Sequence, residues 1–176
     1  AFTKIKVTDF FRAQKQVLAV AFSTSSSAAT LPVTMDVCEK RLGVPTKIAS
    51  FVLPLGTTVN MDGTALYQAV AAMFIAQVYG FDLNLAQQLT IVLTAALAAV
   101  GTAPVPGVGL IMLIIVLKSV GIPEEGIALI IGVDRILDMC RTVPNVIADS
   151  LACVVIANSE GELGEIKPDA AYPGTM

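Results

Sequence analysis

The segment Gly132-Val-Asp-Arg-Ile-Leu-Asp-Met-Cys-Arg-Thr-Val-Pro-Asn-Val-Ile-Ala-Asp149 is the most informative part of this sequence, because it places charged and amide side chains between apolar runs. In a helix its polar residues recur at steps of three or four and therefore form one stripe. The stripe consists of Asp134, Asp138, Arg141, Asn145 and Asp149. If the apolar flanks lie in lipid, these are intramembrane ionisable groups, which are costly there and mark a substrate or ion path.

The composition predicts a membrane setting for this stripe. Of the 176 residues, 55% are hydrophobic and 14% are charged, whereas an average soluble domain is about 25% charged. Between Lys47 and Lys118 the only charged residues are Asp62 and Asp82. We therefore expect an all-α, multi-pass integral membrane protein, or a piece of one, in contact with the lipid bilayer.

Other residue types exclude several classes of protein. The net charge of −3, without a Lys/Arg cluster, argues against a nucleic-acid partner. The sequence has no histidine that could activate the serines at 25–27, so we expect no enzyme. We expect the three cysteines, Cys38, Cys140 and Cys153, to be small core residues, and Tyr67 to be a core aromatic residue rather than a cation–π partner.

Two segments are predicted to be re-entrant helical hairpins, with arms shorter than the roughly 20 residues that span a bilayer. The first, about 7–42, contains the hydroxyl-rich run Ser23–Pro32, in which Thr30 is the expected N-cap of the returning helix, with the proline in its first turn. The second, about 85–120, turns at Gly101–Gly109, where Gly and Pro disfavour helix. No strand precedes this turn and no Lys follows it, which argues against a nucleotide-binding loop.

Two further segments are predicted to be broken transmembrane helices. In the first, about 47–79, the run Gly56–Thr64 contains glycines and polar side chains that compete for backbone hydrogen bonds, and its free oxygen atoms suit a cation. In the second, about 124–158, Pro144 predicts a break near Cys140–Asn145. The order hairpin, broken helix, hairpin, broken helix predicts an inverted repeat of the kind found in secondary transporters.

The ends of the sequence point to a part of a longer protein. Residues 1–163 are expected to form one half of a transport domain, and residues 164–176 a loose polar C-terminal tail. The chain begins at Ala1-Phe-Thr-Lys without a secretory signal pattern. We therefore expect a fragment of a longer polypeptide.

Four motifs, in this order, fit one known family. They are Thr24-Ser-Ser-Ser27 with Thr30-Leu-Pro32, Asn60-Met-Asp-Gly-Thr64, Gly101-Thr-Ala with Val105-Pro-Gly107, and the stripe Asp134, Asp138, Arg141-Thr142, Asn145, Asp149. Together they resemble the C-terminal half of the glutamate/aspartate:cation symporter family, over about 7–163. The resemblance implies an elevator-type, homotrimeric transporter in a plasma membrane, such as a bacterial or archaeal inner membrane. In that family the helices that build the trimer scaffold lie upstream of these motifs.

The resemblance implies a binding site for aspartate, glutamate or both. Arg141 would bind the side-chain carboxylate through two parallel bonds, Asp138 would receive the α-amino group, and Asp134 would hold Arg141. The other substrate contacts that the resemblance implies are Ser26, Ser27, Thr64, Val105, Gly109, Thr142 and Asn145.

The resemblance also implies co-transported sodium ions. One site would consist of Asp149, Asn145, Asn60 and the carbonyl of Gly56, and a deeper one would combine Asp62 with Asn60. A third, under the second hairpin, would use Thr58, the sulfur of Met61 and backbone groups around Ala99, Val100 and Thr102. Proton-coupled relatives tend to carry Asn where this chain has Asp149, so sodium is the expected ion. The second hairpin would act as the gate.

The sequence departs from the family pattern at three points. The family usually has an extra arginine either before the first-tip serines or after the binding aspartate, and this chain has Ser25 and Met139 there. Arg135, one helical turn from Met139, is a candidate substitute. Pro104 replaces a common glycine and would stiffen the second tip, and Pro144 would alter the break in the last helix.

Three alternatives remain beside sodium-coupled symport. A proton-coupled C4-dicarboxylate or glutamate symporter of the same fold would take up substrate without sodium. An ion channel with re-entrant hairpins would lack saturable, stereoselective binding. A soluble helical bundle would dissolve without detergent.

Overall fold

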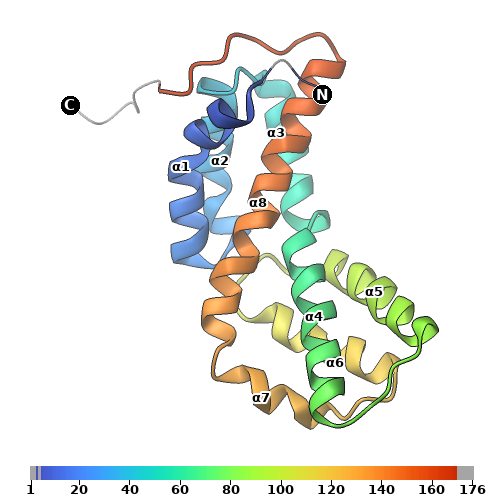
Figure 1. The fold of residues 1–176 in the computed structure, drawn as a ribbon. Coiled ribbons are helices and arrows are strands. Elements are labelled where there is room, and N and C mark those ends of the chain that lie inside the picture. Colours follow the sequence, from blue (N-terminus) through green and yellow to red (C-terminus); the bar gives the residue numbers. More distant parts are fainter. Residues whose placement is uncertain (1–2, 4, 170–176) are drawn as a thin grey trace.

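The computed structural model describes residues 3 and 5–169, and the regular elements there are all helical, as expected from the sequence. In chain order they are α1 (Val7–Thr24), α2 (Ser27–Lys40), α3 (Thr46–Val59), α4 (Asp62–Val78), α5 (Leu85–Val100), α6 (Val108–Ser119), η1 (Glu124–Ile127), α7 (Ala128–Ile131) and α8 (Asp134–Ser159). Figure 1 shows α8 running most of the length of the molecule. Helices α1 to α3 lie beside its C-terminal half, and α4 to α7 lie towards its N-terminal half.

The described residues form two apolar cores, one towards each end of α8. The first core joins α1, α2 and α3 to the C-terminal half of α8 through Val17, Val37, Leu53 and Val154, among others. The second joins α4, α5 and α6 through residues that include Ile75, Ile91, Leu113 and Leu117. The polar stripe of α8 lies between these two cores, so its side chains are buried where the helices of the two halves meet.

The first tip joins α1 to α2 through Ser25 and Ser26. Ser26 caps α2, because its hydroxyl accepts a hydrogen bond of 3.1 Å from the backbone N–H of Ala29. The prediction that Thr30 is the N-cap is therefore wrong. Its hydroxyl instead donates to the Ser26 carbonyl at 2.8 Å. Since the helix starts at Ser27, Pro32 lies inside it rather than in its first turn.

Helices α3 and α4 follow each other end to end and are interrupted only at Asn60 and Met61 (Figure 1). The expected break is thus shorter than Gly56–Thr64. Helix α3 continues to Val59, and the Thr57 hydroxyl bonds within the helix by donating to the Leu53 carbonyl at 2.8 Å. Asn60 has φ −96° and ψ 84°, outside the helical region, so the chain redirects there.

The second tip lies between α5 and α6 and approaches the first. Residues 101–107 are not helical, and Gly107 adopts a positive φ of 83° before α6 begins. The Ser26 hydroxyl donates a 2.8 Å hydrogen bond to the Pro104 carbonyl, and the Ala28 N–H lies 3.4 Å from the same oxygen. The two tips therefore contact each other directly.

The last helix is not broken at Cys140–Asn145, so that prediction is wrong. Helix α8 is continuous from Asp134 to Ser159, with Pro144 inside it. A proline removes one backbone hydrogen bond, but packing on both sides of that turn continues, and the proline ring faces Gly63 of α4. The interruption lies earlier, at Gly132 and Val133, between α7 and α8.

The surface of the described part carries many large apolar side chains. On α5, for example, Leu85, Leu93 and Leu97 are each more than 60% exposed. Among the described helices, α8 is the one that is long and apolar enough to cross a membrane, whereas α5 and α6 are apolar but shorter. Cys140 is exposed, against the expectation of a core residue, while Cys38 and Cys153 are buried.

The C-terminal segment is expected to be a loose tail, but its described part is hydrogen-bonded to the turn between α2 and α3. The Gly164 N–H donates a 2.7 Å bond to the Gly43 carbonyl, and the Lys167 N–H donates a 2.8 Å bond to the Arg41 carbonyl. Residues 170–176 lie outside the described residues. The segment up to residue 169 thus packs along the turn between α2 and α3.

Candidate functional site

The centre of the candidate site is Arg141 of α8, held between two carboxylates of its own helix. Its Nη1 donates a 3.2 Å hydrogen bond to Asp134 Oδ1, and its Nη2 lies 2.8 Å from Asp138 Oδ1. Both carboxylates and the arginine are buried, with Arg141 and Asp138 each 5% exposed. Two carboxylates facing one guanidinium leave a formal charge of −1 in this buried group. Such a group is stable only with further compensating contacts.

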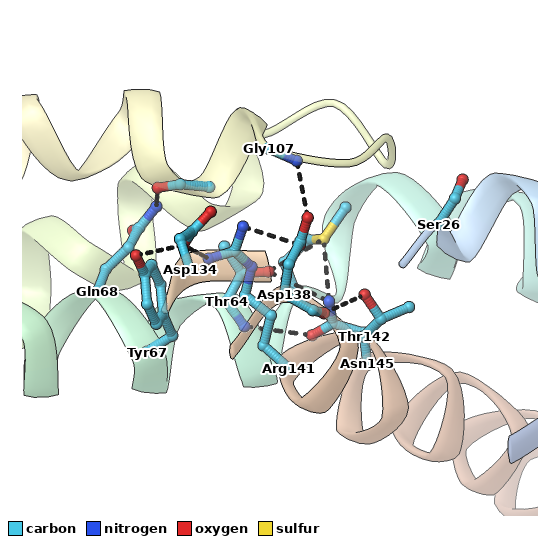
Figure 2. Close-up of polar contacts among 12 residues, drawn as sticks. Ser26, Thr64, Tyr67, Gln68, Gly107, Asp134, Asp138, Arg141, Thr142 and Asn145 are labelled. Carbon is cyan, nitrogen blue, oxygen red and sulfur yellow. Dashed lines mark hydrogen bonds and ion pairs between the residues drawn. The ribbon is translucent and has the colours of Figure 1, made fainter. Parts of the chain in front are cut away.

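Two of those contacts come from Tyr67 of α4. Its hydroxyl donates a 2.7 Å hydrogen bond to Asp134 Oδ1, and its ring lies 4.3 Å from the Arg141 guanidinium carbon, a cation–π arrangement. Figure 2 shows Tyr67, Asp134 and Arg141 gathered at one end of the site. Tyr67 is a core residue, as expected, but the expectation that it is not a cation–π partner is wrong, because its ring and its hydroxyl hold the central arginine and Asp134.

The second tip closes over the same group. The Gly107 N–H donates a 2.8 Å bond to Asp138 Oδ2 (Figure 2). Gly109 approaches the arginine so closely that a Cβ there would lie 2.8 Å from Arg141 Cζ. Gln68 of α4 anchors this end of α6, because its Nε2 donates a 3.2 Å bond to the Gly109 carbonyl. Gln68 is a second residue of the site that sequence analysis did not identify.

Asn145 connects α8 to the break between α3 and α4. Its Oδ1 accepts a 2.7 Å hydrogen bond from the Gly63 N–H, and its Nδ2 donates to Thr64 Oγ1 at 3.2 Å and to Met61 Sδ at 3.4 Å. The amide thereby satisfies backbone groups that the helix interruption leaves free. One helical turn before it, the Thr142 hydroxyl donates to the Asp138 carbonyl at 2.8 Å.

A small cavity lies under the two tips. Its lining includes most of the residues expected to contact substrate, together with Ser25, Met61 and Thr102: Ser27, Thr64, Val105, Gly109, Asp138, Arg141, Thr142 and Asn145. Ser26 is not part of the lining, since its hydroxyl bridges the tips. The cavity has a volume of about 20 Å³. One water molecule needs about 10–15 Å³. The cavity as it stands therefore has room for little more than one water molecule.

A second group of polar residues lies beside the α3–α4 break, in a groove whose other walls are apolar. Gly56, Asn60, Asp62 and Asp149 line one groove of about 390 Å³. Asp149 is buried, and its Oδ1 accepts a 2.9 Å hydrogen bond from Asn60 Nδ2. A Cβ at Gly56 would lie 2.5 Å from that carboxylate oxygen. The structure thus brings these four predicted ion ligands together, with Asn145 one helical turn away on the cavity side.

The residues expected at the third ion site are less closely gathered. Met61 and Thr102 line the cavity, and the Ala99 carbonyl accepts the Thr102 N–H at 3.0 Å. Thr58 is exposed and its hydroxyl donates to the Leu55 carbonyl, while the side chain of Val100 is also exposed.

The missing family arginine is not replaced from α8. Arg135 is exposed on the outer side of the helix, and neither it nor Met139 lines the cavity. The position before the tip serines is occupied by Ser25, which does line it. Pro104 stands at the contact between the tips, where its carbonyl accepts the Ser26 hydroxyl.

Comparison with known proteins places these features in context. The chain matches the model of the sodium:dicarboxylate symporter family over residues 1–159. It is 54% identical to excitatory amino acid transporter 4 of Mus musculus over 155 residues, which are 88% of this chain and 28% of that protein. It is 47% identical to the proton/sodium-glutamate symport protein of Bacillus caldotenax over 163 residues, which are 93% of this chain and 38% of that protein.

A human relative has a similar sequence identity to this chain. Excitatory amino acid transporter 1 of Homo sapiens is 52% identical over 141 residues, which are 80% of this chain and 26% of that protein. The chain thus spans between about a quarter and two fifths of the length of these relatives. The matched family consists of membrane transporters rather than enzymes, and its model covers nearly all of the helical part described above. The chain belongs to the sodium:dicarboxylate symporter family.

Proposed function

We propose that this chain is the substrate- and ion-binding part of a sodium-coupled symporter for acidic amino acids, aspartate, glutamate or both. The observation that carries the proposal is the buried group of Arg141, Asp134 and Asp138 beneath two helical tips. A guanidinium fork matches a carboxylate through two parallel hydrogen bonds. Arg141 would bind the side-chain carboxylate and Asp138 the α-amino group.

The remaining cavity residues suit the polar atoms of the same substrate. Thr64, Thr142 and Asn145 lie beside Arg141 and Asp138, and Ser27, Val105 and Gly109 contribute the walls formed by the two tips. Helices α2 and α6 begin at these tips, and helix N-termini favour negatively charged groups.

The charge of the site supports coupling to cations. The Arg141 group carries −1, and an acidic amino acid adds another −1, so binding would leave about two uncompensated negative charges at a buried place. Burying unpaired charge is strongly unfavourable. Cations held nearby by Gly56, Asn60, Asp62, Asn145 and Asp149 would offset this charge, and a third ion near Thr58, Met61, Ala99, Val100 and Thr102 would favour the closed second tip.

Opening and closing would be carried out by the second tip. Opening requires loss of the Gly107–Asp138 bond and of the contact between Ser26 and Pro104. Substrate and sodium would supply contacts that close the tip again. A carrier loaded with only one of the two would not close its tip, and it would therefore not move. The gate would thereby couple the ion gradient to uptake.

The surrounding architecture is proposed from the family resemblance. The pairs α1–α2 and α5–α6 would be re-entrant hairpins, and α3–α4 and α7–α8 broken membrane helices, related as an inverted repeat. The exposed leucines of α5 support contact with lipid or with a scaffold. The complete protein would be a homotrimer of elevator type in a plasma membrane.

The test is uptake of labelled L-aspartate and L-glutamate into liposomes that contain the complete transporter. We expect saturable uptake driven by an inward sodium gradient. Uptake driven equally well by a proton gradient without sodium would favour the proton-coupled alternative, which the name of the Bacillus caldotenax relative also admits. Absence of saturation would contradict symport.

A further inference from the structure

The chain reverses its direction after α8 and crosses the end of the first half of the molecule. The Glu162 N–H donates a 2.9 Å hydrogen bond to the Ala157 carbonyl, and Gly161 between them adopts a φ of +72°. This is a Schellman motif, which ends a helix and redirects the chain. Residues 160–169, which we call the C-terminal strap, then run back over the ends of α3 and α2 (Figure 1).

Side chains attach the strap to α3, in addition to its two main-chain hydrogen bonds with the turn before that helix. Leu163 is partly buried and packs against the first apolar core, which includes Leu53 of α3 and Val154 of α8. Lys47, near the start of α3, donates a 2.7 Å bond from Nζ to Glu162 Oε1. An exposed ion pair contributes little by itself, so Leu163 and the main-chain bonds hold most of the strap. The strap thus joins the end of α8 to the start of α3.

The same two helices form the ion groove farther along their length. Gly56 of α3 faces Asp149 of α8 so closely that a Cβ at Gly56 would lie 2.5 Å from the carboxylate oxygen. Asn60, at the end of α3, donates a 2.9 Å bond to the same carboxylate. From Lys47 to Gly56, and from Asp149 to the end of α8, the helices advance by roughly 14–15 Å at 1.5 Å per residue. The helix pair is therefore held at two places, at the groove and at the strap.

We propose that the C-terminal strap positions the cation groove, because it fixes the distance between α3 and α8. Groups that bind a ligand must be held within about 0.5 Å of their productive geometry. Since Gly56 and Asp149 belong to different helices, a change in the spacing of these helices changes the distance between the two proposed ligands. This inference rests on the proposed function, because it concerns the affinity of the cation groove proposed above.

The substrate-binding group should depend less on the strap than the groove does. Arg141 is held by Asp134, Asp138 and Tyr67, in the half of α8 that lies away from the strap. Figure 1 shows the strap at the opposite end of α8 from α4 and α6. Loosening the strap should therefore change the sodium dependence of binding and leave the contacts of the substrate itself in place.

The test compares three variants of the complete, detergent-solubilised transporter with the wild type. Gly43→Ala displaces the strap, since a Cβ there would lie 2.8 Å from the Glu165 carbonyl oxygen. Leu163→Ala removes the apolar contact of the strap without introducing a steric conflict. Gly80→Ala is the matched control, because Gly80 also has a positive φ, of +73°, but a Cβ there would meet no atom within 4 Å.

Three quantities are measured for each protein: the sodium concentration for half-maximal binding of L-aspartate, the Kd for L-aspartate at saturating sodium, and the Tm. We expect the half-saturating sodium concentration to rise roughly two- to tenfold in both strap variants, less than the loss of about 10–100-fold that is typical of groups in direct contact with a metal ligand. The Kd at saturating sodium should stay within about twofold of the wild-type value, because excess sodium fills the weakened groove. The Tm of both strap variants should fall. Gly80→Ala should keep the sodium dependence of the wild type.

Three results would overturn the inference. A lower Tm with the sodium dependence of the wild type in both strap variants would show that the strap only stabilises the fold. A rise of the same size in the half-saturating sodium concentration of Gly80→Ala would assign the effect to general destabilisation. Both of these results leave the proposed function intact, whereas sodium-independent binding of L-aspartate by the wild type would refute the proposed function and the role of the strap with it.

Discussion

Substitution of Gly109 by alanine tests how closely the second tip must approach the central arginine. A Cβ at this position would lie 2.8 Å from Arg141 Cζ, 3.0 Å from Nη2 and 3.1 Å from Nε. Carbon atoms pack favourably at about 3.5–4.0 Å, so the guanidinium or the tip must move by roughly 0.7–1.2 Å. The guanidinium cannot move freely, because Asp134, Asp138 and the Tyr67 ring hold it.

The substitution should weaken both substrate binding and folding. Functional groups generally must be held within about 0.5 Å of their productive geometry, and the displacement exceeds this tolerance. We expect the Kd for L-aspartate to rise roughly ten- to a hundredfold, or about 1.4–2.8 kcal/mol. The thermal stability should fall as well, because the guanidinium that must shift is held by buried contacts with Asp134, Asp138 and Tyr67.

Gly101→Ala is the matched control in the same tip. A Cβ there would meet its nearest neighbours, the Ala98 carbonyl oxygen and Met112 Cε, at ordinary distances of 3.7 and 3.8 Å. Calorimetric titration of both variants in sodium separates the two cases. Wild-type affinity in Gly109→Ala, or an equal loss in Gly101→Ala, would refute the argument that the approach of Gly109 to Arg141 shapes the site.

Three further predictions concern the arginine, the ion groove and the C-terminal segment. Arg141→Ala should remove measurable affinity for acidic substrates while sodium binding persists; equal loss of both would contradict the assigned role. Asp149→Asn keeps the volume of the side chain and the hydrogen bond from Asn60 but removes the charge. The sodium concentration for half-maximal substrate binding should therefore rise. An unchanged sodium concentration would exclude Asp149 from ion binding. Gly43→Ala combines a φ of +71° with a Cβ 2.8 Å from the Glu165 carbonyl oxygen, and should lower the free energy of unfolding by about 1–3 kcal/mol. Gly80→Ala, with a φ of +73° but open space, should cost less in thermal unfolding; an equal cost would show that the contact with the C-terminal segment contributes nothing.

The helical class and the family follow from the sequence because they rest on features repeated along the chain. Apolar runs without charge leave few alternatives to a helical membrane fold, and four motifs in a fixed order leave few alternative families. The polar stripe of α8 was predictable because a helical period of 3.6 residues places Asp138, Arg141 and Asn145 on one face. The structure accordingly brings these three side chains to one cavity.

The helix boundaries were harder to predict because local propensity competes with tertiary packing. Pro144 was expected to break the last helix, yet α8 continues through it because both neighbouring turns are packed. Gly56 was expected to end a helix, but its small size accommodates the Asp149 carboxylate. A glycine can serve either purpose, and sequence alone does not distinguish them.

Some site residues depend on contacts between distant segments and leave no local signal. Tyr67 and Gln68 lie in an apolar helical run where an aromatic residue and an isolated amide are ordinary. Their roles arise from contacts with Asp134 and Gly109, which are 67 and 41 residues away in sequence. Ser25 was read only as the absence of an arginine, since the burial of its hydroxyl is a property of the folded tip.

The most direct test of the central claim is calorimetric titration of L-aspartate into the complete, detergent-solubilised transporter, with and without sodium. The account predicts that affinity rises steeply with sodium, because the cations offset the negative charge that substrate adds to the Arg141 group. Equal affinity in the two buffers would contradict sodium coupling, and would leave Asp149 as a buried carboxylate without a role in ion binding.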